Sequence, residues 1–506
     1  MRLWTRTILA LLVAAGCVVA AAGVLAAGAQ AAVPSLAVSG NRLIDTASGA
    51  TFVPRGVNWP SFEYACFHGY GYSNTAGPAS VGPTAEQAAL IASWHANVVR
   101  VPLNQDCWLG DDGAPGGPGL TAQGYRDAVA SWVGLLHGAG LAVILDLHWS
   151  GPLGLPADGQ RMMADDRSPA FWSSVAATFK GDRGVLFDAF NEPYSRDALT
   201  LTWPCWRDGG CQAMARNDGD ADDGRRFTIT GMSALVAAIR AAGAPQPILL
   251  GGLDYANDLR GWLDAKPVDG QLVASFHNYG GQRCHTAACW DAEIAPVAAQ
   301  VPVVTGEFGE TDCTDTHVTN YMNWADARGI GYLAWQWVVL APDELADPPC
   351  ASLRLIEGPS GTPAAPNGTA LKAHLAALAA GTPPPGGPGS GTPAPPAPGS
   401  ARRTPARRGG DRTAPKLTKT SVTRRRGALV LALTLNEPAT VRATLQRRIG
   451  RRTRRVLVLR RHAKRGAVRL VVTRRALRAG RYRLVVAVTD AAGNRARSRT
   501  LGFRVG

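Results

Sequence analysis

The C-terminal part of this chain has almost no acidic residues. Residues 401–506 contain only Asp411, Glu437 and Asp490 against 31 lysines and arginines, a net charge of +28. Residues 1–400 contain 35 acidic and 22 basic residues, a net charge of −13. Two parts of opposite charge indicate two modules with different partners. They argue against a single nucleic-acid-binding domain, and we expect no nucleic acid partner.

Charged residues are also scarce in the chain as a whole. They make up 18% of its 506 residues, whereas hydrophobic residues make up 46%. This composition excludes wholesale disorder, because most of the chain can bury a core. The length allows about two to four domains, or one large barrel with attachments.

Cysteine is absent after residue 350, and the chain has no Cys-x-x-Cys pair. The spacing therefore matches no zinc pattern, and we expect neither a metal nor a cofactor. One of the nine cysteines lies in the N-terminal segment, and an even number remains, which favours disulfide bonds in an exported protein. Spacing alone does not fix the pairs. The eight candidates are Cys66, Cys107, Cys205, Cys211, Cys284, Cys289, Cys313 and Cys350.

Residues 1–31 are typical of an export signal. Arg2 and Arg6 form a basic start, residues 8–29 carry no charge, and Ala29-Gln30-Ala31 is a small-residue cleavage site. An uncleaved membrane anchor is the alternative, because the uncharged run is long enough to span a bilayer. The run is rich in alanine and glycine, so its apolar character is weak. We therefore expect a cleaved signal and a secreted protein, with attachment to the cell surface as the alternative.

Eight short apolar runs alternate with helical stretches between about residues 50 and 340. Most of the runs lack a hydrophobic–polar alternation, as expected for strands covered on both faces. Eight β-then-α units predict a closed parallel (β/α)8 barrel, the α/β fold known as the TIM barrel. The predicted strands are Val53–Val57, Asn97–Pro102, Ala142–Leu147, Val185–Phe190, Pro247–Gly251, Leu272–Phe276, Val301–Thr305 and Gly331–Gln336.

A linker and a second module are expected after the barrel. Residues 381–400 contain eight prolines and six glycines, too many for a packed core. Beyond them, runs such as GAVRLVV and GRYRLVVAVTD alternate arginine with apolar residues, as half-buried antiparallel strands do. We predict an all-β sandwich of about seven strands. The expected domains are a signal (1–31), a barrel (32–378), a linker (379–412) and a basic sandwich (413–506).

Two glutamates follow predicted barrel strands, where the catalytic residues of such barrels lie. Glu192 follows the fourth strand and Glu307 the seventh. Paired carboxyl groups suit the cleavage of a glycosidic bond, because one protonates the leaving oxygen and the other attacks or stabilises the sugar-ring cation. Asn191 is placed to bind a sugar hydroxyl. Flat apolar rings on which sugars can stack are offered by Trp335, Trp59 and Trp108.

The ordered motifs RGVNW, VVRVPL, LDLHW, FNEP, FHNY, GEFG and AWQW resemble glycoside hydrolase family 5, the cellulase-type (β/α)8 glycosidases, over roughly residues 40–375. That family keeps a set of eight residues, and each has a match in order. The matches are Arg100, His148, Asn191, Glu192, His277, Tyr279, Glu307 and Trp335.

The resemblance implies a retaining mechanism with Glu192 as acid/base and Glu307 as nucleophile. It implies that Arg100 and Tyr279 support the nucleophile, and that the two histidines of the set line the first sugar subsite. We therefore expect a monomeric, secreted endo-β-glycosidase that hydrolyses a β-1,4-linked polysaccharide, either a glucan or a mannan. The alternatives are another β-glycan such as a β-1,3-glucan, an oligosaccharide substrate, or a non-catalytic carbohydrate-binding protein that reuses the barrel.

The cysteines all fall on loops that follow predicted strands, at the catalytic mouth. Because each pair should join nearby loops, we predict Cys66–Cys107, Cys205–Cys211, Cys284–Cys289 and Cys313–Cys350. The basic sandwich, with TDAAGN before its last strand, loosely resembles bacterial Ig-like modules. Its charge would suit an anionic cell-wall polymer. A role as a solubilising spacer is the alternative.

Overall fold

The computed structural model describes residues 33–385 and 415–505, with gaps at 70, 74–80, 118, 197–198, 221, 341–343, 347, 426–427, 438, 450–451, 464–465, 474–479, 491–495 and 497. The predicted export signal and most of the predicted linker lie outside the described residues. The chain divides into two compact units, Met1–Thr392 and Pro393–Gly506.

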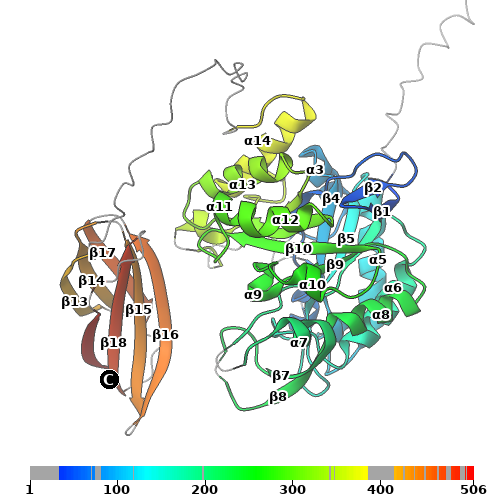
Figure 1. Cartoon of the computed structure of the whole chain (residues 1–506). Coiled ribbons are helices and arrows are strands. Elements are labelled where there is room, and N and C mark those ends of the chain that lie inside the picture. Colours follow the sequence, from blue (N-terminus) through cyan, green and yellow to red (C-terminus); the bar gives the residue numbers. More distant parts are fainter. Residues whose placement is uncertain are drawn as a thin grey trace, which may run out of the picture. The chain divides into compact units, whose positions relative to one another are not determined.

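Eight parallel strands of the first unit close into a barrel in the order β10-β11-β12-β3-β4-β5-β6-β9 (Figure 1). Each predicted strand corresponds to one of them, so the predicted TIM barrel is confirmed. The strands are β3 (Arg55–Asn58), β4 (Val98–Asn104), β5 (Ala142–Trp149), β6 (Val185–Asp188), β9 (Ile248–Gly251), β10 (Leu272–Tyr279), β11 (Val303–Gly309) and β12 (Gly331–Ala334).

Helices cover the outside of the barrel (Figure 1). The longest, α5, buries a stripe at helical spacing that includes Tyr125, Val129, Trp132 and Leu136. The helices are α2 (Ala65–His68), α3 (Ala85–Ser93), α4 (Gln105–Leu109), α5 (Ala122–Gly138), α6 (Ser168–Phe179), α7 (Trp203–Asp208), α8 (Met232–Ala241), α9 (Leu253–Ala256), α10 (Trp262–Ala265), α11 (Ala287–Cys289), η1 (Trp290–Ile294), α12 (Ala295–Ala298), α13 (Thr316–Asp326), η2 (Pro349–Ser352) and α14 (Asn367–Ala379).

Two short hairpins accompany the barrel, β1 (Leu36–Ser39) with β2 (Arg42–Asp45) and β7 (Gly209–Met214) with β8 (Arg226–Thr230). Leu36 and Leu43 of the first hairpin pack into one cluster with apolar residues from inside the barrel. Most of these residues come from the first halves of the strands, as Ile144 does. The hairpin therefore closes the N-terminal end of the barrel.

Inward-facing residues change from apolar to polar along the strands. On β5, Ala142 and Ile144 belong to the apolar interior cluster, and Asp146 and His148 are the next residues on the same face. Within the described residues, the interior polar groups thus gather at the C-terminal ends of the strands. This is the end at which barrels of this type place their functional residues.

The second unit contains two antiparallel sheets with a shared core. One has the order β13-β14-β17 and the other β16-β15-β18-β19. Leucines of β14 and alternate residues of β18, such as Leu484 and Val486, pack in the same apolar cluster. The described strands are β13 (Leu417–Arg425), β14 (Ala428–Leu435), β15 (Ala439–Ile449), β16 (Arg452–Ala463), β17 (Gly466–Thr473), β18 (Gly480–Asp490) and β19 (Arg499–Val505).

None of the helices in the described part of the chain combines the length and the apolar character that a bilayer-spanning helix requires.

Candidate active site

Arg100 lies at the centre of the polar layer inside the barrel. Its side chain is fully buried, and it donates to Asp188 Oδ2 at 3.0 Å and to Asn191 Oδ1 at 2.8 Å. It also lies 3.0 Å from Asp146 Oδ2 and 2.9 Å from Glu307 Oε1. Burial alone would lower the pKa of Arg100, but the three surrounding carboxylates raise it. The guanidinium therefore stays charged and orients its partners.

Glu307 reaches the barrel interior through an irregularity in β11. In the pairing of β11 with β12, the register shifts between Thr305 and Phe308. In the pairing of β11 with β10, it shifts between Phe276 and His277. Such a shift re-aims a side chain that strict alternation would point outward. Gly306 is needed at this point, because a Cβ there would lie 2.8 Å from His277 Nε2.

Both carboxylate oxygens of Glu307 accept hydrogen bonds. Arg100 Nη1 donates to Oε1 at 2.9 Å, and the hydroxyl of Tyr279 donates to Oε2 at 2.7 Å. Burial raises the pKa of Tyr279 well above its usual value, so this hydroxyl keeps its proton. The two donors fix the orientation of the carboxylate, and its side chain is still 6% exposed.

Glu192 has a different environment. His277 Nδ1 lies 2.8 Å from its Oε1, and Gln160 Nε2 donates to its Oε2 at 2.8 Å. Burial raises the pKa of Glu192, against the lowering effect of the Gln160 hydrogen bond. Burial also lowers the pKa of His277 to about 3, so the imidazole is neutral and its Nδ1–H is the donor. The buried environment of Glu192 thus favours the protonated form of its carboxyl group.

The two carboxyl groups lie close to each other. Glu192, His277 and Glu307 each contribute one polar atom to a group whose atoms are all within 4.8 Å of one another. The same three atoms are close enough to hold a metal ion, but hydrogen bonds from protein groups already reach both carboxylates. A second group of possible ligands contains Cys284 and Cys289, which form a disulfide.

His148 and Trp335 form a stacked pair beside the carboxyl groups. Their ring centroids lie 5.4 Å apart, with an interplanar angle of 8°. Asp146 Oδ2 lies 2.7 Å from His148 Nδ1 and so sets the orientation of the imidazole. Burial lowers the pKa of His148 to about 4, so the ring is neutral. Trp335 is partly exposed and can offer part of its surface to a ligand.

Two predicted binding residues are not part of this arrangement. Trp59 and Trp108 have no exposed surface and belong to the core outside the strands. Trp59 packs on Trp132, with the ring centroids 4.7 Å apart. Trp108 donates its indole N–H to the hydroxyl of Ser174. The prediction that these two residues bind substrate is wrong, because buried rings offer no face to a sugar.

Several polar residues of the site did not stand out in the sequence. Gln160 lies in an irregular loop between β5 and α6, where no pattern marks it. Asn58 and Asp188 both bond to Arg100, and they are the last residues of β3 and β6. Asn58 stands in the RGVNW motif noted in the sequence, and the place of Asp188 at a strand end is a signal that could have identified it.

The four predicted cysteine pairs all occur in the structure: Cys66–Cys107, Cys205–Cys211, Cys284–Cys289 and Cys313–Cys350. The bonded cysteines lie on segments that follow strands β3, β4, β6, β10, β11 and β12. Cys66–Cys107 and Cys313–Cys350 therefore join different loops at the end of the barrel that holds the two glutamates, and the other two disulfides each close a turn within one loop.

Solved structures with the same fold include a β-glucanase from Saccharophagus degradans, SdGluc5_26A. Its native form is 18% identical to this chain with a TM-score of 0.50, and the match covers 69% of this chain and 96% of that one. Its complex with cellotetraose is 19% identical, with the same coverage and TM-score. The catalytic domain of Thermobifida fusca endoglucanase Cel5A (E5) is 16% identical with a TM-score of 0.44, covering 68% of this chain and 98% of that one.

A comparison with curated proteins finds no significant match. The family model described as "Cellulase (glycosyl hydrolase family 5)" matches residues 54–339, which is more than half of the chain. The matched segment includes every barrel strand and both glutamates. On this match, the chain belongs to glycosyl hydrolase family 5.

Proposed function

We propose that the protein is a retaining endo-β-glycosidase that hydrolyses β-1,4-linked polysaccharide, a glucan or a mannan. The observation that carries this proposal is the approach of an oxygen of Glu192 to within 4.8 Å of an oxygen of Glu307. Retaining glycosidases hold their carboxyl groups about 5–5.5 Å apart, whereas inverting enzymes need about 6.5–9.5 Å to admit a water molecule. The short separation favours attack by the enzyme itself.

Glu307 is the nucleophile in this mechanism. Its carboxylate forms a bond to the anomeric carbon while the bond from that carbon to the leaving oxygen breaks. Arg100 and Tyr279 hold both carboxylate oxygens in place, so little reorganisation is needed for the attack. The product of this step is a glycosyl ester on Glu307.

Glu192 is the acid and then the base. Its raised pKa supports a protonated carboxyl group, and this proton passes to the leaving oxygen in the first step. In the second step the Glu192 carboxylate takes a proton from water, whose oxygen attacks the anomeric carbon. The ester bond to Glu307 breaks and both glutamates return to their starting states.

The remaining polar residues bind the sugar. Arg100 holds Asn191 Oδ1, which leaves the amide N–H groups of Asn191 to donate to a sugar hydroxyl. His148 and Trp335 form a flat wall beside the carboxyl groups, and stacking on such rings suits the apolar faces of sugars. The β-1,4-glucan preference is supported by the cellotetraose named in the complex of the related β-glucanase. A β-1,3-glucan or an oligosaccharide remains the second candidate substrate.

We further propose that the enzyme is secreted and acts as a monomer, with no metal or cofactor. Four disulfides support an oxidising compartment. The proposed organisation is a signal at 1–31, the catalytic barrel at 32–378, a linker at 379–412 and an Ig-like module at 413–506. The two-sheet arrangement of the second unit supports the last assignment.

Hydrolysis of β-1,4-glucan, mannan and β-1,3-glucan by the wild type and two variants tests the proposal. Glu192→Gln and Glu307→Gln should each lower kcat by about 10³-fold or more. Glu310→Gln changes a buried glutamate three residues further along and should keep the activity. A chelator should not change the rate.

Product analysis adds two readouts. Proton NMR should show that the first product has the β configuration, and size analysis should show internal cleavage. Hydrolysis at the wild-type rate by either site variant, or an α product, would refute the proposed mechanism.

A further inference from the structure

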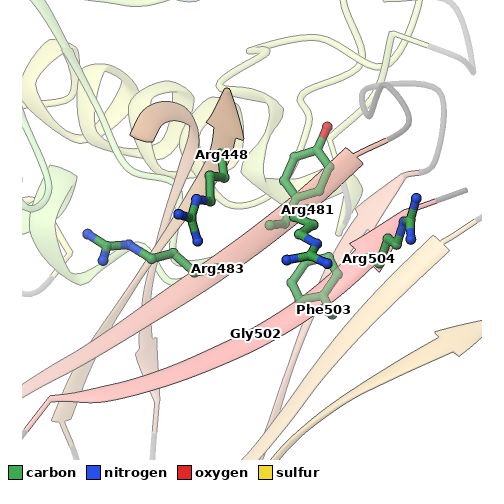
Figure 2. A pocket seen from close by; sticks show the side chains of 7 residues that line it. Arg448, Arg481, Arg483, Gly502, Phe503 and Arg504 are labelled. Carbon is green, nitrogen blue, oxygen red and sulfur yellow. The ribbon is translucent and has the colours of Figure 1, made fainter. Parts of the chain in front are cut away.

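A pocket of about 640 Å³ lies at one end of the four-stranded sheet in the C-terminal unit. Four arginines gather around it from adjoining strands (Figure 2), and all four are exposed. The lining consists of Arg448, Arg481, Tyr482, Arg483, Gly502, Phe503 and Arg504.

The pairing of β18 with β19 places like charges opposite each other. Arg481 is the direct cross-strand partner of Arg504, and Arg483 is the partner of Gly502. Directly opposed like charges destabilise a sheet. A Cβ at Gly502 would have nothing within 4 Å, so the surface opposite Arg483 is open. Repulsion between these arginines therefore destabilises this end of the folded sheet. An anion that lies between the guanidinium groups would relieve that repulsion.

Glu437, the acidic residue of this unit whose side chain the structure describes, belongs to the other end of the sheet. β18 runs from Gly480, beside the pocket, to Asp490, and ten residue steps along a strand span roughly 33 Å. Asp490 pairs with Ala439 at the start of β15, and Glu437 lies two residues before Ala439. Arg481, Arg483 and Arg504 are therefore far along the strands from Glu437.

The strands that carry the arginines are held in place by packing on the opposite face of the sheet. Tyr482 and Phe503 are cross-strand partners with stacked rings. The ring centroids lie 5.7 Å apart and the interplanar angle is 9°. Tyr482 is only 4% exposed and packs in the core between the sheets. Arg483 donates from Nε to Gln446 Oε1 on β15, which orients its side chain. These contacts hold the strands that carry the arginines.

We propose that this pocket binds an anionic glycopolymer through its carboxylate or phosphodiester groups. Cβ atoms of cross-strand partners lie about 5 Å apart, and alternate residues of one strand lie about 7 Å apart. The positive charges are therefore spread over an area of the sheet surface. A patch of this width suits a chain with repeated oxyanions better than a single small anion, because each oxyanion of the chain can bond to a different guanidinium group. The choice of a glycan over other polyanions rests on the proposed polysaccharide hydrolase function of the same chain.

Binding of the full-length protein to two polymers tests the site. Polygalacturonate carries carboxylates and poly(glycerol phosphate) carries phosphodiesters, so the pair distinguishes the two sources of the same chemistry. We expect binding in 50 mM salt that weakens as the salt concentration rises. The double variant Arg481→Ser/Arg504→Ser should bind at least about tenfold more weakly.

Lys416→Ser/Lys419→Ser is the matched control, because it removes the same charge from two exposed positions, one just before β13 and one within it, on the other sheet. This variant should bind like the wild type. Equal weakening in both double variants, no binding to either polymer, or tighter binding to double-stranded DNA would each overturn the proposal.

Two further measurements separate this proposal from the enzymatic one. The arginine double variant should unfold at the same temperature as the wild type or a higher one, because it relieves opposed charges. Its rate on a neutral β-glucan should not change. Loss of binding with hydrolysis intact therefore concerns the pocket alone, and loss of hydrolysis with binding intact concerns only the barrel.

Discussion

The hydroxyl of Tyr279 lies 2.7 Å from Oε2 of Glu307 and donates a hydrogen bond to it. The two residues stand on neighbouring strands, β10 and β11, where Glu307 pairs with His277 and Tyr279 pairs with Gly309, so the tyrosine reaches the carboxylate diagonally. Because burial raises the pKa of Tyr279, the phenol does not lose its proton in the working pH range of a glycosidase. The carboxylate consequently has a neutral donor on one oxygen and a cation on the other.

Replacement of Tyr279 by phenylalanine should lower kcat by about tenfold to a hundredfold, because a hydrogen bond to a charged group is worth about 1.5–3 kcal/mol. KM should change little, since the ring remains. Steady-state kinetics on a soluble β-glucan measures both values. An unchanged kcat would show that the hydroxyl does not support Glu307.

Gln160→Leu should move the basic limb of the pH–rate profile to higher pH. The Gln160 amide donates to Glu192 and lowers the pKa of that carboxyl group, so its loss lets burial raise the pKa further. The proposed acid is active while protonated, so the rate falls as pH rises through this pKa, and in the variant the fall should begin at a higher pH. Gln123→Leu on the exposed face of α5 is the control. A shift to lower pH would contradict the assignment.

Trp335→Ala should raise KM for polysaccharide about tenfold, because the partly exposed ring is lost from the wall of the site. Trp108→Phe should instead lower the melting temperature and leave KM unchanged, because Trp108 is fully buried. Kinetics and thermal unfolding of both variants distinguish a binding tryptophan from a packing one. A raised KM in Trp108→Phe would reverse the correction made for that residue.

Glu63 should make the fold less stable at alkaline pH. Burial raises its pKa to about 8 from an ordinary value of 4.5. Between these values the folded state holds a proton that the unfolded state has lost, so stability falls as pH rises through this window. Each pKa unit corresponds to about 1.4 kcal/mol.

Glu63→Gln removes this titration and keeps an oxygen that can accept from the Ser61 amide. Urea unfolding at pH 9 should therefore show the variant to be more stable than the wild type by about 2 kcal/mol or more, with a much smaller difference near pH 5. If the wild type were equally stable at pH 5 and pH 9, Glu63 would not be protonated in the folded state as described.

Loss of the Cys66–Cys107 disulfide should cost more stability than loss of Cys205–Cys211. The first closes a loop with a sequence separation of 41 and the second one of 6. From loop-closure entropy, the first disulfide should stabilise the folded state by about 4 kcal/mol and the second by about 2 kcal/mol. Thermal or urea unfolding of the two double alanine variants measures the difference. The reverse order would show that packing around the sulfurs outweighs chain entropy.

The barrel was predictable because its strands are short apolar runs covered on both faces, which few other folds require. Strand ends were less accessible to sequence reasoning. β11 was expected to end at Thr305 and continues to Gly309, because the register shift lets the strand carry Glu307 inward. No hydrophobic pattern reports such an irregularity.

The direction in which a side chain points explains the errors in the site. Asn58 faces Arg100, so alternation turns the next residue, Trp59, outward into the helical layer. That inference was possible from the sequence once the strand end was known. Gln160 was not predictable, because it reaches Glu192 from a loop whose path depends on tertiary contacts.

The position of Arg100 has a consequence for how this enzyme can diverge. One guanidinium joins groups from β5, β6 and β11, and among them is Glu307, the proposed nucleophile. Any replacement at this position perturbs the architecture and the chemistry together. New specificities should therefore arise in the surrounding loops, while this residue stays fixed through the history of the lineage.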